Sequence, residues 1–177
     1  LTLLQIYLGA LVAGLDAAAE GEVCSVANDN DPSQVVISGA KGAIDRAVGL
    51  AKDHGAKRAV LLPVSAPFHC PLMQPAADAM AQALADVVLR APLVPVFANV
   101  TAAAVSHPDT IRTLLVEQVT GMVRWRESVA AMFEGGVGEF VELGGKVLGA
   151  MVKRIAPDAG VTSVVTMEDI EALEKAL

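Results

Sequence analysis

The sequence predicts an α/β protein in which a ferredoxin-like region is followed by a region of alternating helices and strands. Up to Pro63, the expected elements follow the order β-α-β-β-α-β, which is the order of a ferredoxin-like unit. From Pro71 onward, helices alternate with single strands, and this order favours a mainly parallel sheet with helices on its faces. We therefore expect two regions, residues 1–63 and residues 64–177.

Apolar runs separated by turn-forming residues define the first region. Residues 1–13 are apolar but fall short of the roughly 20 residues that a membrane span needs, so we expect a buried strand there. Asn, Asp, Pro and Ser at 29–33 predict a loop. An apolar face at helical spacing begins at Ile44, and Gly55 stands where a glycine often follows a helix. The expected elements are strands at 1–13, 23–28, 34–39 and 56–64, and helical segments at 15–22 and 41–55.

Helical periodicity dominates the second region. Residues 71–89 carry an apolar stripe along one helix face. Pro108, which is favourable at the first helical position, and Gly121 bound another helix. Thr166 and Asp169 have the spacing of a capping box, with Asp in place of the usual Glu. The expected elements are helices at 71–89, 108–121, 123–136, 146–155 and after residue 166, and strands at 94–100, 137–145 and 161–167.

Composition and charge exclude several classes of function. Twenty acidic against thirteen basic residues give a net charge of −7, which argues against a nucleic-acid partner. Two cysteines, Cys24 and Cys70, are too few for a disulfide scaffold or a four-cysteine zinc site. We therefore expect a reduced, cytoplasmic setting, no metal, and neither nucleic acid nor a membrane as partner.

His69 is the first candidate for chemistry, because it lies between an apolar strand and the helix expected to begin near Pro71. The partial positive charge of a helix N-terminus disfavours an imidazolium, so we expect a neutral ring that can accept a proton. The alternative is a histidine that only caps the helix or packs against Phe68. The adjacent Cys70 is expected to be a small buried residue rather than a catalytic partner, because sequence neighbours do not face each other on a helix.

Gln118 is the second candidate, because its amide falls on the apolar stripe of the helix expected at 108–121. A buried amide needs hydrogen-bond partners, so Gln118 either serves a site or ties a loop to the core. A nucleophilic serine is not evident, because no GxSxG motif occurs in the 177 residues.

Five segments, in the same order along the chain, resemble the malonyl-CoA:acyl-carrier-protein transacylase family. They are VANDNDPSQVVISG, GAKRAVLLPVSAPFHCPLMQPAA, PVFANVTA, LVEQVTGMVRWRESV and FVELGGKVLGAMVKRI, between Val26 and Ile155. The resemblance implies an α/β-hydrolase-like core with an inserted ferredoxin-like subdomain. Residues 1–63 would then be the small subdomain, and residues 64–177 the C-terminal portion of the core.

The resemblance also implies roles for individual residues. His69 corresponds to the general base that activates a serine, and the backbone carbonyl of Gln118 to the group that orients its imidazole. Phe68 corresponds to the aromatic residue of malonyl-selective members, and would exclude an α-methyl group. Asn28 and Asn30 lie in the family's asparagine-rich loop beside the active-site cleft, where they would contact the substrate.

The implied reaction is a ping-pong transfer of malonyl from coenzyme A to acyl carrier protein, as in fatty-acid biosynthesis. No cofactor is expected, because coenzyme A enters only as the thioester substrate. Malonyl-CoA and the acidic carrier protein are the expected partners. The candidate basic docking residues are Lys57, Arg58, Arg124, Arg126, Lys153 and Arg154.

The family's serine elbow and its carboxylate-binding arginine have no counterpart in this sequence. We therefore expect the chain to be the C-terminal part of such an S-malonyltransferase, holding the base and not the nucleophile. One alternative is the acyltransferase domain of a polyketide synthase. Another is a non-catalytic remnant that serves as an interaction module.

Overall fold

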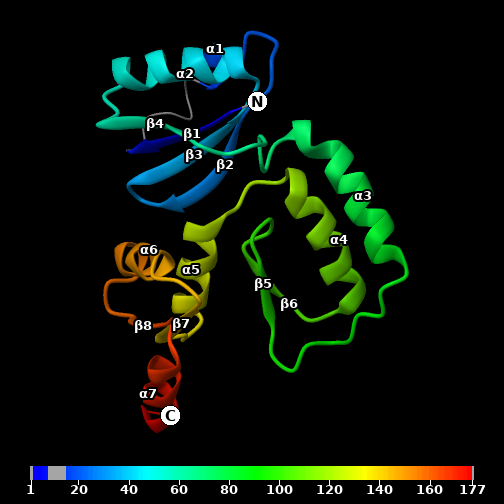
Figure 1. Ribbon diagram of the computed structural model, residues 1–177, viewed down its shortest axis with the longest axis vertical. Coiled ribbons are helices and arrows are strands. Elements are labelled where there is room, and N and C mark those ends of the chain that lie inside the picture. Colours follow the sequence, from blue (N-terminus) through cyan, green and yellow to red (C-terminus); the bar gives the residue numbers. More distant parts are fainter. Residues whose placement is uncertain (1, 8–14, 177) are drawn as a thin grey trace. The chain divides into compact units, whose positions relative to one another are not determined.

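A computed structural model of the protein describes residues 2–7 and 15–176 (Figure 1). The chain separates into two compact units, Leu1–Ser128 and Val129–Leu177. Helices and strands alternate through both units, so the mixed α/β class expected from the sequence is confirmed. The boundary expected at residue 63 lies inside the first unit and stays a prediction. None of the helices in the described ranges is long and apolar enough to cross a membrane.

Four antiparallel strands form a sheet in the first unit. Their order is β2-β3-β1-β4, with β1 (Thr2–Tyr7) and β3 (Gln34–Gly39) central and β2 (Cys24–Asp31) and β4 (Arg58–Leu62) at the edges. Helices α1 (Leu15–Ala19) and α2 (Lys41–Asp53) lie on the same face of this sheet (Figure 1). The strand expected at 1–13 is confirmed over β1, and its other residues lie outside the described ones.

Aliphatic side chains from α1, α2 and β3 make the core between the helices and the sheet. Burial of a side chain such as Ile37 or Ile44 contributes about 1.5–3 kcal/mol. Gly55 follows the end of α2 with φ of +79°, a conformation that glycine adopts at little cost, so the expected helix end is confirmed. The fully buried residues of this cluster are Ala18, Ile37, Ile44, Ala47 and Ala51.

The loop expected at 29–33 is wrong, because β2 continues through Asp31 and only a tight turn joins it to β3. The buried carboxylate of Asp31 closes that turn by accepting hydrogen bonds from the backbone N–H and the hydroxyl of Ser33, at 2.8 and 2.7 Å. Two register shifts between β2 and β3 accommodate the polar residues in the strand. Asn28 and Asn30 are therefore strand residues and not loop residues.

Two helices and a short hairpin complete the first unit. The 3₁₀ turn η2 (Pro71–Met73) leads into α3 (Gln74–Ala85), which lies beside α4 (Pro108–Thr120) (Figure 1). The single buried strand expected at 94–100 is instead the first half of an antiparallel hairpin of β5 (Val96–Ala98) and β6 (Ala103–Val105). The strand β6 was not expected because its alanines favour a helix in isolation.

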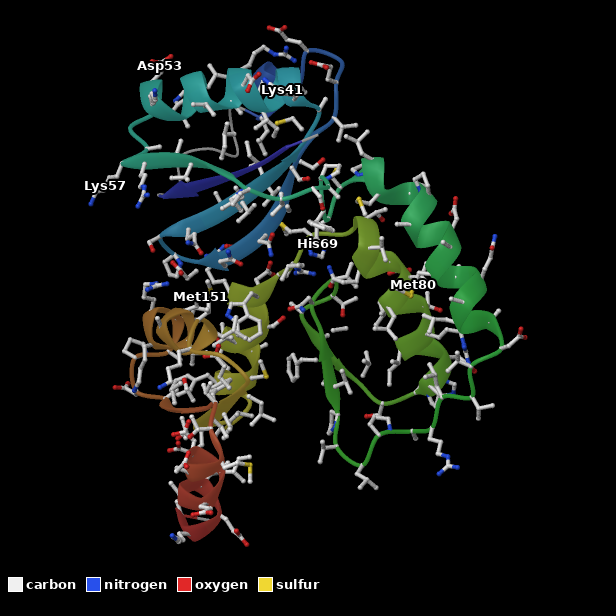
Figure 2. The ribbon with its side chains drawn as sticks, viewed as in Figure 1. Lys41, Asp53, Lys57, His69, Met80 and Met151 are labelled. Carbon is white, nitrogen blue, oxygen red and sulfur yellow. The ribbon has the colours of Figure 1, made fainter. Side chains whose placement is uncertain are left out.

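The apolar stripe expected on residues 71–89 does not become a buried face. Ala77 is the one residue of α3 that is buried, while Met80 remains exposed (Figure 2). The helix also ends at Ala85, four residues before the expected end. Arg112 of α4 fixes this end by donating to the backbone oxygens of Leu84 and Val87.

The second unit contains the parallel pair β7 (Glu139–Leu143) and β8 (Gly160–Val164), connected through α6 (Leu148–Ile155). Helix α5 (Trp125–Glu134) leads into this unit and α7 (Met167–Ala176) follows β8. The mainly parallel sheet expected for residues 64–177 is wrong for the described residues, because β5–β6 is antiparallel and β7–β8 forms a separate two-stranded sheet.

Candidate active site

His69 lies in the connection between β4 and η2, and its backbone holds an uncommon conformation. Its φ is +58°, in the left-handed region that few residues other than glycine adopt, although histidine is enriched among those that do. Pro71 starts the helical turn two residues later, as the sequence predicts. The sharp bend turns the imidazole toward the end of α4 (Figure 2).

The imidazole contacts the backbone of Gln118, 49 residues further along the chain. Nδ1 of His69 lies 2.9 Å from the carbonyl oxygen of Gln118. Gln118 is in the last turn of α4, where backbone oxygens have no partner inside the helix. The N–H of Gly121 makes the last regular helical bond, to the oxygen of Glu117, and the extended backbone of Gly121 ends the helix before Met122, whose N–H would otherwise bond to Gln118. The oxygen of Gln118 is therefore free to accept from the ring.

This contact determines which ring nitrogen of a neutral His69 carries the proton. A backbone carbonyl can only accept a hydrogen bond, so Nδ1 must be the donor and Nε2 keeps its lone pair. The side-chain Nε2 of Gln118 also approaches Nδ1, at 3.5 Å, but it donates to the oxygen of Gly121 at 2.9 Å. We therefore assign the shorter contact as the hydrogen bond of the ring.

The helix end that contacts the ring differs from the one expected from the sequence. From the sequence we expected the N-terminus near Pro71 to act on the ring. The hydrogen bond in the structure is instead with the opposite end of a different helix.

The neighbours of His69 have separate positions. Phe68 is 41% exposed. Cys70 is fully buried, and its thiol donates to the backbone oxygen of Pro67 at 3.1 Å. The expectation that Cys70 is a small buried residue is thus confirmed, and its hydrogen bond fixes the turn that carries His69.

Asn28 and Asn30 differ in their connection to this site. Asn28 forms a parallel bridge with Val123, in the segment that follows Gln118 and α4. Asn30 lies further along β2, and its side-chain amide donates to the side-chain oxygen of Gln34 at 3.0 Å. The structure therefore brings Asn28 to the segment that follows the acceptor of His69, whereas the side chain of Asn30 is hydrogen-bonded at the β2–β3 turn.

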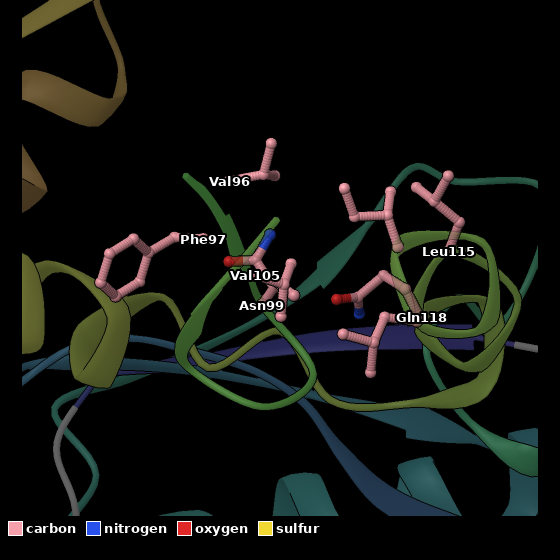
Figure 3. Close-up of a pocket in the computed structure, with 9 residues that line it drawn as sticks. Val96, Phe97, Asn99, Val105, Leu115 and Gln118 are labelled. Atoms are coloured by element: carbon pink, nitrogen blue, oxygen red, sulfur yellow. The ribbon is translucent and has the colours of Figure 1, made fainter. Parts of the chain in front are cut away.

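A small cavity of about 130 Å³ lies on the side of Gln118 that faces the β5–β6 hairpin (Figure 3). Its walls are aliphatic except for Phe97 and the amides of Asn99 and Gln118. Sequence reasoning missed Asn99, and its only signal is a polar residue directly after a short strand. The Gln118 side chain forms part of the cavity wall, and its amide is satisfied by donating to the oxygen of Gly121 at 2.9 Å.

Two of the arginines expected from the sequence to contact the carrier protein, Arg124 and Arg126, are paired with carboxylates of this chain. Arg124 donates to Glu127, with Nε 2.9 Å from Oε1, and this bond lowers the pKa of Glu127. Arg126 donates to both carboxylate oxygens of Asp29, with Nη2 2.7 Å from Oδ2. Their charge is therefore partly compensated within the protein.

Nε2 of His69 has no hydrogen-bond partner among the side chains that the structure describes. The described residues also contain no group of His, Cys, Asp and Glu that could hold a metal ion. The arrangement can accept a proton at Nε2 from a group that approaches this nitrogen.

Known proteins with similar sequences and structures are acyltransferases. Malonyl CoA-acyl carrier protein transacylase of Haemophilus influenzae is 44% identical over 169 residues, which are 95% of this chain and 54% of that protein. The crystal structure of an acyl-carrier-protein-S-malonyltransferase from Bartonella henselae matches 99% of this chain and 57% of its own, with a TM-score of 0.91 and 45% identity.

A third similar protein is a malonyl-transacylase in complex with its type II PKS acyl-carrier protein. It matches 98% of this chain and 58% of its own, with a TM-score of 0.93 and 38% identity. The chain spans about half the length of the curated relatives it matches. The sequence pattern of the acyl transferase domain family covers residues 13–156, which is most of the chain. The chain therefore belongs to the acyl transferase domain family.

Proposed function

We propose that the protein transfers malonyl from coenzyme A to acyl carrier protein in fatty-acid biosynthesis, with His69 as the general base. One observation carries this proposal: the carbonyl of Gln118 holds Nδ1 of His69, which leaves Nε2 free to accept a proton. The relatives named as malonyl transacylases support the choice of substrate. The nucleophile is a serine that residues 1–177 do not supply.

In the first half of the reaction, Nε2 of His69 takes the proton of the serine hydroxyl as its oxygen attacks the thioester carbonyl. The carbon–sulfur bond breaks, and coenzyme A leaves with the proton that His69 returns. In the second half, His69 takes the proton of the carrier protein's thiol, and the sulfur attacks the serine ester. The carbon–oxygen bond of the ester breaks, and the serine regains its proton from His69. A base positioned in this way contributes about 10²–10⁴-fold to the rate.

Phe68 and Asn28 are the residues that we place next to the substrate. Phe68 is exposed beside His69, so its ring limits the space at the α-carbon of the acyl group. Asn28 lies opposite Val123 and is half-buried, and its side-chain amide would hydrogen-bond to the acyl group or to the pantetheine arm. Asn30 contributes less, because its amide is bonded to Gln34. The reaction requires no cofactor.

At a finer level, we propose that the first sheet is a ferredoxin-like subdomain and that the remainder is part of an α/β-hydrolase-like core. The strand order β2-β3-β1-β4, with two helices on one face, supports the first assignment. The parallel pair β7–β8 joined through α6 supports the second. The two free cysteines suit a cytoplasmic location.

A polyketide pathway is the second candidate for this chemistry. The observation in its favour is the similar malonyl-transacylase bound to a type II PKS acyl-carrier protein. The two functions share the base and differ in the carrier protein that accepts the malonyl group. Rates with purified carrier proteins of each type separate them.

The experiment follows labelled malonyl from malonyl-CoA to carrier protein with the full-length protein that contains this chain. We expect His69→Ala to slow transfer by at least about 10²-fold, because the base is lost. His54→Ala is the matched control, since His54 is exposed at the end of α2, and it should leave the rate unchanged. Absence of transfer by the wild-type protein, or an unchanged rate in His69→Ala, would refute the proposal. Either result would favour the alternative of a non-catalytic interaction module.

A further inference from the structure

The segment that follows α4 is joined to the edge strand β2 by a short set of strong contacts. The N–H of Val123 donates to the oxygen of Ala27 at 2.8 Å, and the N–H of Asp29 donates to the oxygen of Val123 at 2.9 Å. Beside this bridge, Arg126 meets Asp29 through both Nε and Nη2. The contacts therefore fix residues 123–126 to the sheet.

The same segment is coupled to the acceptor of His69 through the end of α4. The side chain of Gln118 donates to the oxygen of Gly121, and the N–H of Gly121 bonds to Glu117. A Cβ at position 121 would lie 2.7 Å from Cγ2 of Val100, so the chain at this point has little freedom to shift. A displacement of residues 123–126 would consequently move the Gln118 carbonyl.

We propose that the Asp29–Arg126 ion pair is a positioning element that keeps the Gln118 carbonyl at hydrogen-bond distance from His69. The inference rests on the proposed function and adds two residues to its machinery. The backbone bridge alone is one residue long, with two hydrogen bonds. A two-pronged guanidinium–carboxylate contact fixes the direction of approach and is stronger than a single hydrogen bond, and here it links the side chain of a β2 residue to this segment.

The surroundings of the pair favour a positioning role over a solvated surface contact. The side chain of Asp29 is only 13% exposed, and that of Arg126 is 48% exposed. Exposed ion pairs contribute little, whereas a two-pronged pair with one largely buried partner restrains the chain at both ends. By contrast, the nearby Arg124–Glu127 pair joins residues of one short stretch and cannot fix it to the sheet.

The test measures kcat and KM for malonyl-CoA with the full-length protein and the variants Arg126→Gln, Asp29→Asn and their combination. Covalent labelling of the protein by malonyl in a single turnover gives the concentration of active sites. The value of kcat is calculated from that concentration, so misfolded protein does not lower it. We expect each single variant to lower kcat by about tenfold to 10²-fold, because a displacement of about 1 Å of a catalytic group lowers the rate by up to about 10²-fold. KM should change less than about twofold, since substrate contacts are retained.

The double variant tests whether the two residues act as a pair. We expect it to be no slower than the slower single variant, because either change already removes the contact. Arg126→Lys should recover part of the loss. The matched control is Asp45→Asn, which removes the exposed Lys41–Asp45 pair on α2 and should leave kcat unchanged.

The outcomes distinguish this inference from the proposed function. Unchanged kcat in both single variants, or losses that multiply in the double variant, would overturn the positioning role while an active wild-type protein upholds the transferase. A fall confined to KM would also overturn it, because it would place the pair at the substrate. An inactive wild-type protein would refute the proposed function and this inference with it.

Discussion

At the level of single residues, the site depends on backbone positions that tolerate little change. His69 adopts a positive φ, and its acceptor, Gln118, lies in a helix end that a glycine closes. Gly121 has φ and ψ values that any residue can adopt. Glycine is needed there because a side chain would not fit, not because the backbone conformation is unusual. A side chain at this position would meet both Val100 and the oxygen of Glu117.

We predict that Gly121→Ala lowers the free energy of unfolding by about 1–3 kcal/mol, because the added Cβ would lie 2.7 Å from Val100 Cγ2 and 2.9 Å from the oxygen of Glu117. Gly49→Ala is the control, since Gly49 lies inside α2 with open space around its Cβ. It should raise the free energy of unfolding by about 0.5–1 kcal/mol. Urea denaturation measures both, and equal effects would contradict the steric argument.

We predict that Phe68→Ala changes the choice of acyl group. Removal of the ring opens space at the α-carbon, so the rate with methylmalonyl-CoA relative to malonyl-CoA should rise by about tenfold or more. Leu72→Ala, which truncates an exposed apolar residue on η2, serves as the control and should leave the ratio unchanged. A competition assay with both thioesters measures the ratio. An unchanged ratio in Phe68→Ala would remove Phe68 from the specificity pocket.

The sequence singles out His69 and Gln118 as candidates, but it does not predict the geometry that joins them. Both residues follow from local motifs. Their contact spans 49 positions, and the proton assignment follows from it. Neither the positive φ of His69 nor the ion pair between Asp29 and Arg126 has a local signal, because each depends on tertiary packing.

At the level of elements, the N-terminus of α6 is capped by a side chain from the preceding strand. The carboxylate of Glu142, in β7, accepts hydrogen bonds from the N–H groups of Val147, Leu148 and Gly149. These bonds lower the pKa of Glu142, first through Leu148 and then through Val147 and Gly149. A negative charge at this helix end is favourable.

We predict that Glu142→Gln lowers the Tm at neutral pH and that the difference from wild type shrinks in acid. The pKa of Glu142 in the folded protein lies below the ordinary value of 4.5, so its stabilisation is present above pH 4.5. It is lost as the pH falls through the folded pKa, where the carboxyl becomes neutral like the amide. Thermal unfolding from pH 7 to about pH 3 measures the effect.

The control for this prediction is Glu171→Gln, which makes the same charge change at an exposed position of α7. The Tm of Glu171→Gln should stay close to that of the wild type at every pH in this range. A Tm difference for Glu142→Gln that stays constant in acid would show that the carboxylate does not cap α6.

Helix ends with local signals were predictable, and those with distant partners were not. The capping box expected before α7 is confirmed, because Asp169 accepts from the N–H groups of Val165 and Thr166 while its own N–H donates to Thr166. Glu142 precedes its helix by several residues and was missed. For the same reason the strand β6 was missed, since its pairing with β5 outweighs the helix propensity of alanine.

At the level of the whole molecule, both units expose large apolar side chains. A parallel pair such as β7–β8 is usually covered on both faces, yet Val141 and Leu143 of β7 are exposed. The exposed large apolar residues from the end of α3 to the start of β5 are Val87, Val88, Leu93, Val94 and Val96, and those of the second unit are Val137, Val141, Leu143, Val147, Leu148, Val165, Met167 and Ile170.

We predict that a polypeptide of residues 1–177 alone binds the dye ANS and self-associates, because soluble monomers rarely expose extensive apolar surface. Light scattering after size-exclusion chromatography measures the mass, and ANS fluorescence measures the apolar surface. Replacement of Val88, Leu93 and Val94 by serine should reduce both signals. A monomer that binds no ANS would contradict the prediction.

The decisive measurement for the proposed chemistry is the position of the proton on the His69 ring in solution. The chain has three histidines, so ¹⁵N-histidine labelling and the variant His69→Gln assign the signal. Long-range ¹H–¹⁵N correlation at about pH 8 should show a protonated Nδ1 and a bare Nε2, as the bond to Gln118 requires. A ring protonated at Nε2 with a bare Nδ1 would contradict the assignment of His69 as the base.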